Sequence, residues 1–111
     1  MMYKDVKEVP IEHVLISQRE KVLEGAKKCV LQDRNNTYGP PEDSFERVAA
    51  LWNADIGNGS SLTSVDASNM LILLKLARNR ENPLHFDNYV DIAGYAACGA
   101  ECAFKEVKVN S

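Results

Sequence analysis

The amino-acid sequence predicts an all-α protein, a bundle of the four-helix type. Apolar residues recur at helical spacing in four segments, and proline, glycine or capping residues separate these segments. No run of residues alternates between apolar and polar side chains as a half-buried strand does. A chain of 111 residues is long enough for one core, with little to spare. Both a monomer and a bundle completed by oligomerisation fit this size.

The composition is that of an ordinary globular protein. Hydrophobic residues make up 45% of the sequence, charged residues 26%, and the net charge is −3. This acidic balance argues against non-specific nucleic-acid binding. No segment approaches the roughly 18 apolar residues of a membrane helix, and the first residues lack the apolar run of a signal peptide. The three cysteines are sparse and odd in number, which favours free thiols and a cytoplasmic location.

The first helix is predicted from Ser17 to about Arg34. Ser17 and Glu20 have the spacing of a capping box, in which each side chain satisfies a free backbone amide near the other. Apolar or small residues follow at helical spacing: Val22, Leu23, Ala26, Cys29 and Val30. Residues 17–111 are expected to form a single helical domain. Residues 1–16 fit either an extended arm or a short extra helix.

The segment Gly39-Pro40-Pro41 is expected to separate the first helix from the second. A residue that precedes proline is disfavoured in the α conformation, whereas Pro41 itself suits the first helical position. Glu42 and Asp43 then stand in the first turn, where the helix dipole favours anions. Gly57 suits the end of this helix. The buried stripe is predicted to consist of Phe45, Val48, Ala49 and Trp52.

The third and fourth helices follow a loop, residues 57–64, whose glycines and serines indicate flexibility. Thr63 with Asp66 opens the third helix, which is apolar on nearly all sides over residues 70–76 and is therefore expected at the centre of the bundle. Asn82-Pro83 is typical of the N-terminus of a helix, so the fourth helix is expected to begin there or as late as Asp87. Alanines and glycines gather in residues 93–100, so a neighbouring helix can approach closely.

Two pairs of acidic residues form a candidate metal site. Glu42 and Glu46 lie four residues apart on the second helix. Asp87 and Asp91 lie four apart on the fourth, so each pair shares a helical face. Two such pairs that face each other across a bundle can hold Mg²⁺ through carboxylate oxygens. The structural alternative is that these acids are helix caps, dipole partners or solvated side chains, and Asp91, between apolar neighbours, fits that alternative least well.

Basic and aromatic residues form a candidate anion pocket. Lys75 and Arg78 share one face of the third helix, and Lys75 interrupts an otherwise apolar stretch. Both side chains bind phosphate, arginine as a planar fork and lysine as a point charge. The other predicted ligand-binding residues are Arg34, Asn35, Asn36, Tyr38 and Tyr95. The two tyrosines suit stacking on a base. The structural alternatives are cations that favour a helix C-terminus and tyrosines at the rim of the core. We assign no catalytic residue.

Three sequence blocks carry a resemblance to known proteins. They are RNNTYGPPEDSFERVAALW (34–52), DASNMLILLKLAR (66–78) and NPLHFDNYVDIAGYA (82–96). Their order resembles an uncharacterised family of small bacteriophage and prophage helical proteins. At greater distance the layout is similar to the MazG-like all-α nucleoside triphosphate pyrophosphatases. Those are helical bundles, usually oligomeric, that hold Mg²⁺ with clustered acids and cleave nucleotides between the α and β phosphates.

The acidic motifs depart from the MazG-like pattern. The first motif of that superfamily is Glu-x-x-Glu, whereas three residues separate Glu42 from Glu46 here. The second motif, Glu-x-x-Asp, is matched loosely by Asp87-Asn-Tyr-Val-Asp91. The resemblance therefore implies a nucleotide-related pocket more strongly than it implies catalysis.

Three functions are compatible with these patterns. The first is the binding, by sequestration, of a nucleotide or nucleotide-derived signalling molecule, which needs anion donors and no metal. The second is Mg²⁺-dependent hydrolysis of a nucleoside triphosphate, in which the two acidic pairs hold the metal. The third is a protein–protein adaptor, which predicts a large exposed apolar patch. The departures in both acidic motifs favour binding, with a nucleotide-like small molecule and a second copy of the chain as the expected partners.

Overall fold

The computed structural model describes residues 17–110, and within that part of the chain every regular element is a helix. The elements are α2 (Gln18–Lys28), the π-helical segment η1 (Cys29–Asp33), α3 (Arg34–Tyr38), α4 (Pro41–Ile56), α5 (Ser64–Glu81) and α6 (Phe86–Asn110). Because α2, η1 and α3 follow one another without a break, they form one rod, and the predicted all-α, four-helix architecture is confirmed. The arm or extra helix predicted for residues 1–16 lies outside the described residues.

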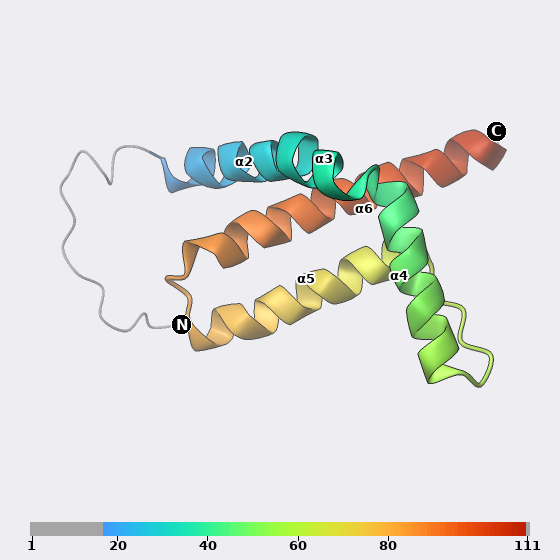
Figure 1. Cartoon of the computed structure of the whole chain (residues 1–111). Coiled ribbons are helices and arrows are strands. Elements are labelled where there is room, and N and C mark those ends of the chain that lie inside the picture. The colour runs from blue at the N-terminus through green and yellow to red at the C-terminus, as the bar shows by residue number, and fades with distance from the viewer. Residues whose placement is uncertain (1–16, 111) are drawn as a thin grey trace.

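The helices form a layer of three with a fourth across it. The α2–α3 rod, α6 and α5 lie side by side, and α4 crosses them at a steep angle (Figure 1). In this layer α6 contacts α2, α4 and α5. The prediction that residues 70–76 of α5 lie at the centre of the bundle is therefore wrong. The centre belongs to α6, whose small residues allow helices to approach on more than one side.

Helices α5 and α6 approach each other closely at Ser68 and Gly99. A Cβ atom added to Gly99 would lie 2.5 Å from the Ser68 Oγ atom, so this position has room only for glycine. The Ser68 hydroxyl donates a hydrogen bond of 2.7 Å to the Tyr95 carbonyl, one turn earlier on α6. On the other side of α6, a Cβ atom on Gly94 would lie 3.3 Å from Val30. The predicted close packing through residues 93–100 is confirmed.

The core is small and is built where α4 crosses α5 and α6. Its buried members are Phe45, Ala49, Ala67, Cys98 and Cys102. Phe45 is fully buried, and its ring lies 6.3 Å from that of Tyr95, centroid to centroid. Val48 and Trp52 pack against this cluster and are partly buried, which confirms the predicted stripe of α4. The cysteines of α6 are thus small core residues, and none of the three cysteines forms a disulfide.

Most helix ends follow from local capping chemistry. The Thr63 amide donates to the Asp66 carboxylate at 2.9 Å, and the Asp66 amide donates to the Thr63 hydroxyl at 3.1 Å, so these residues open α5 with a capping box. At the capping box predicted for the first helix, the Glu20 amide donates to the Ser17 hydroxyl at 3.3 Å. Pro41 occupies the first turn of α4, and Gly57 ends that helix with a positive φ of 68°. The first rod is longer than predicted, because it runs through η1 and continues past Arg34 as α3 to Tyr38. It ends where Gly39 adopts a φ of 79°.

The loop between α4 and α5 is held by one side chain. The Asn53 Oδ1 atom accepts hydrogen bonds of 2.8 Å from the Leu62 amide and from the Ser60 hydroxyl, and its Nδ2 atom donates one of 2.9 Å to the Leu62 carbonyl. The prediction of a flexible loop rested on its glycines and serines. That composition could not reveal the hydrogen bonds of Asn53, because this residue lies outside the loop on α4. None of the described helices has the length and hydropathy to cross a membrane.

We expect Gly99→Ala to lower the free energy of unfolding by about 1–2 kcal/mol. Overpacking and the loss of the Ser68 hydrogen bond outweigh the gain of about 1 kcal/mol that alanine brings to a helix. Chemical denaturation of the variant with and without Ser68→Ala measures the effect. The cost should shrink when the serine hydroxyl is absent. Equal costs in both backgrounds would show that the added methyl group does not meet Ser68.

We expect Asn53→Ala to cost about 2–3 kcal/mol of stability, because it removes three hydrogen bonds and leaves the Leu62 amide without its acceptor. Hydrogen exchange at that amide should accelerate beyond the change expected from global stability. Asp55→Ala is the matched control, since Asp55 is an exposed residue on the same helix. Its effect should stay within about 0.5 kcal/mol. An equal loss in both variants would contradict the assignment of the anchor to Asn53.

Candidate functional site

A polar cavity of about 490 Å³ lies between the C-terminal half of α5 and the N-terminal half of α6. A tight turn joins the two helices there. The His85 amide donates to the Asn82 carbonyl at 3.1 Å, and the Tyr89 hydroxyl donates to the Pro83 carbonyl at 2.8 Å. Side chains near this turn therefore face one another. The cavity is lined by Lys75, Arg78, Asn82, His85, Asp87, Asn88 and Asp91.

The cavity is lined by two cationic and two anionic side chains, and only one cation and one anion among them form an ion pair. The Lys75 ammonium lies 2.8 Å from the Asp91 carboxylate, and the lysine side chain is only 14% exposed. This pair explains why each residue interrupts an apolar stretch of its helix. Among the described residues, neither Arg78 nor Asp87 has an ion-pair partner. The cavity therefore offers a guanidinium and a carboxylate to an incoming molecule.

Three lining residues were not predicted from the sequence: Asn82, His85 and Asn88. Asn82 was interpreted only as a helix-capping residue, so its place in the cavity lining was not predicted. Asn88 is 4% exposed, one of the few buried polar residues in the described chain. Its position directly after Asp87, one turn before Asp91, was a signal that could have placed it on this surface. The amide groups of both asparagines can donate and accept hydrogen bonds.

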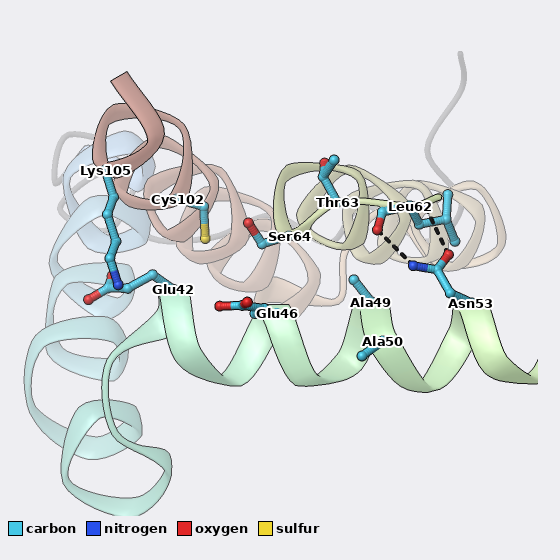
Figure 2. Close-up of a pocket in the computed structure, with 10 residues that line it drawn as sticks. All are labelled: Glu42, Glu46, Ala49, Ala50, Asn53, Leu62, Thr63, Ser64, Cys102 and Lys105. Carbon is cyan, nitrogen blue, oxygen red and sulfur yellow. Dashed lines mark hydrogen bonds between the residues drawn. The ribbon is translucent and has the colours of Figure 1, made fainter. Parts of the chain in front are cut away.

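A second cavity, the acidic cleft, lies where α4 meets the start of α5 and the end of α6. It has a volume of about 460 Å³. Figure 2 shows Glu42 and Glu46 projecting from α4 into it, with Lys105 of α6 close to Glu42 and Asn53 at the opposite end. The Lys105 ammonium also lies 3.9 Å from the carboxylate of Asp43. This exposed cation partly balances the acids of the cleft.

The structure brings four of the predicted site residues together at the polar cavity and places the others elsewhere. The four are Lys75, Arg78, Asp87 and Asp91. Arg34, Asn35, Asn36 and Tyr38 belong to α3, away from the turn that joins α5 to α6 (Figure 1). Tyr38 is 61% exposed. Tyr95 packs against Phe45 beside the core. The segment Arg34–Tyr38 and the basic face of α5 therefore do not line one pocket.

The two acidic pairs also lie in different places. Glu42 and Glu46 line the acidic cleft, whereas Asp87 and Asp91 line the polar cavity. Over residues 17–110, no group of three or more histidine, cysteine or acidic side chains is placed to hold a metal ion. The reason is the crossing of α4, whose acids meet α6 near Lys105 rather than near its first turns. Within one described chain, the four carboxylates do not surround one position.

Comparison with known proteins places the chain in a family. The family described as "Domain of unknown function (DUF6378)" matches residues 21–103, which include most lining residues of both cavities. The "Gene 55 protein" of Mycobacterium phage D29 is 34% identical over 79 residues, 71% of this chain and 51% of that protein. The "Gene 55 protein" of Mycobacterium phage L5 is 43% identical over 75 residues, 68% of this chain and 47% of that protein.

The chain thus spans about half the length of these curated relatives. No solved structure matches it. The match over residues 21–103 includes most of the α2–α3 rod and of α6, and all of α4 and α5. Both relatives are phage proteins. The chain belongs to the DUF6378 family of small phage proteins.

Proposed function

We propose that this protein binds a nucleotide or a nucleotide-derived signalling molecule in the polar cavity and sequesters it without chemistry. The observation that carries the proposal is the presence of Lys75 and Arg78 beside Asp87 and Asp91 in one cavity of about 490 Å³. Small-molecule sites typically have volumes of about 300–1,000 Å³. None of the three cysteines forms a disulfide, which suits a reducing cytoplasm, where such molecules occur.

A nucleotide matches the mixed charge of this cavity. Its phosphate is an acceptor that the Arg78 guanidinium can bind through two parallel hydrogen bonds. Its sugar hydroxyls and base amino groups are donors, which the Asp87 carboxylate can accept. The asparagine amides, Asn82 and Asn88, can satisfy either kind of group. Inorganic phosphate alone would leave the acidic side of the cavity without a partner.

The Lys75–Asp91 pair favours binding without a metal. The ammonium stands 2.8 Å from the carboxylate, in the position that a cation bound to Asp91 would take. Mg²⁺ would have to displace it, or to bind beside a positive charge. The predicted residues of α3 and Tyr95 are not needed for this mode of binding, because the polar cavity supplies both cationic and anionic groups.

The alternative is a Mg²⁺-dependent MazG-like nucleoside triphosphate pyrophosphohydrolase. The observation in its favour is the acidic cleft, in which Glu42 and Glu46 lie on one face of α4 (Figure 2). In that case Mg²⁺ would be held there by carboxylate oxygens and would supply charge for phosphate cleavage. The third candidate, an adaptor, is favoured by the exposed apolar side chains of several helices.

We expect Arg78→Ala to weaken nucleotide binding by about ten- to a hundredfold, which is the cost of losing charge-assisted hydrogen bonds to phosphate. Isothermal titration calorimetry with mononucleotides, cyclic dinucleotides and ADP-ribose, each with and without Mg²⁺, measures the dissociation constants. The matched control is Arg80→Ala, because Arg80 lies on the same helix outside the cavity. Equal dissociation constants for both variants would place the ligand elsewhere, and no binding by the wild-type protein would overturn the proposal.

We expect Asp91→Asn, assayed beside the wild-type protein, to help separate sequestration from hydrolysis. The variant frees the Lys75 ammonium from its partner, so metal-free binding of a nucleotide should be kept or strengthened. A pyrophosphate-release assay with Mg²⁺ should be silent for both the wild-type protein and the variant if the protein only sequesters its ligand. Pyrophosphate release by the wild-type protein would favour the hydrolase and contradict sequestration.

A further inference from the structure

We propose that two copies of this protein pair through the outer face of α5, antiparallel to each other about a two-fold axis near Leu73. The proposal concerns a surface rather than the ligand. It specifies the homo-oligomer expected from the sequence. Ligand binding uses Lys75 and Arg78, whereas pairing is centred on Leu73, so either can fail in experiment while the other holds.

The outer face of α5 is apolar where solvent is expected. Ala67 and Ser68 are buried against the rest of the fold, and Lys75, two turns on from Ser68, points the same way. The opposite side bears Met70, Leu73 and Ala77, all exposed and at helical spacing, and Leu74 lies at its edge, seven residues after the buried Ala67. Leu73 is 62% exposed and Leu74 is 46% exposed. The helix thus has two packing faces, of which the described chain covers one.

A single chain buries few large apolar side chains for a domain of this size. The buried apolar residues among those described are Ala26, Phe45, Ala49, Ala67, Val90, Cys98 and Cys102, and only one of them has a large side chain. Several large apolar side chains are instead open to solvent, including Leu51 and Ile56 near the end of α4. That end extends past α5 and gives a partner a second surface beside the outer face (Figure 1). A stable interface needs about 800 Å² from each partner, more than one helix face alone supplies.

The charges at the two ends of the outer face identify the occupant as a second copy. Asp66 stands seven residues before Leu73, and Arg80 stands seven residues after it. In an antiparallel pair centred on Leu73, the acid of each copy therefore approaches the base of the other. A parallel pair would place like charges together. Such self-complementarity is what a two-fold interface requires, and a different partner would have no reason to share it.

The test is the molar mass in solution by sedimentation equilibrium at rising protein concentration. The wild-type protein should reach the mass of two chains, whereas Leu73→Glu should stay at one. The matched control is Leu31→Glu, since Leu31 on η1 is 64% exposed, close to the 62% of Leu73, and lies outside the proposed face. Circular dichroism verifies that each variant is folded. A wild-type monomer, or a Leu73→Glu dimer, would overturn the proposal.

A charge exchange tests the antiparallel arrangement separately. Arg80→Glu makes both ends of the face acidic, and Asp66→Lys makes both ends basic, so each variant alone should dimerise more weakly than the wild-type protein. The double variant Asp66→Lys/Arg80→Glu should restore the mass of two chains, because each acid again meets a base in the antiparallel pair, whereas a parallel pair would keep like charges together. A double variant that dimerises no better than the single variants would contradict the antiparallel pairing. Nucleotide titration of Leu73→Glu shows whether the polar cavity works without the interface.

Discussion

The close contact of Ser68 with Gly99 is the constraint on which the rest of this structure depends. It fixes the axial offset between α5 and α6, because a side chain at position 99 would collide with the serine hydroxyl. Lys75 lies two helical turns after Ser68, and Asp91 lies about two turns before Gly99. Since the two helices are antiparallel, both residues move toward the turn together and meet, and their ion pair of 2.8 Å is a consequence of that register.

The same contact explains why the protein exposes so much apolar surface. Glycine, serine and alanine bring helices close, but they bury little area, and a helix pair built from them gains less hydrophobic stabilisation than one built from leucines. Phe45 of α4 is the largest fully buried side chain among the described residues, and Leu71 of α5 and Tyr95 of α6 pack against its cluster while only partly buried. Three leucines of α5 are left exposed: Leu73, Leu74 and Leu76. The close packing of α5 on α6 through small residues thus leaves larger apolar side chains of α5 exposed.

Local chemistry predicted much of this fold, whereas the site depended on register that no local pattern contains. The capping box at Thr63 and the break at Pro41 are short-range effects, and the helices begin where these residues indicated. Lys75 and Asp91 were each singled out because they interrupt apolar runs. Their pairing could not be predicted, since it requires the offset between two helices. The apolar residues of α5 were expected at the centre of the bundle, but Leu73 and Leu74 are exposed in the described chain. Hydropathy alone cannot show which apolar side chains the fold covers.

The Lys75–Asp91 pair also limits what a ligand of the polar cavity can be. The lysine is 14% exposed and its partner 38%, so the carboxylate is the more accessible of the two. An anion that attracts the ammonium away from Asp91 would leave a partly buried carboxylate without its counter-charge, at a cost in desolvation. A ligand avoids that cost only if it brings hydrogen-bond donors for Asp91 together with an anionic group for Arg78. A phosphate attached to a hydroxyl-bearing sugar has both, whereas a simple anion has only one, so under the proposed function the ion pair would favour the larger molecule.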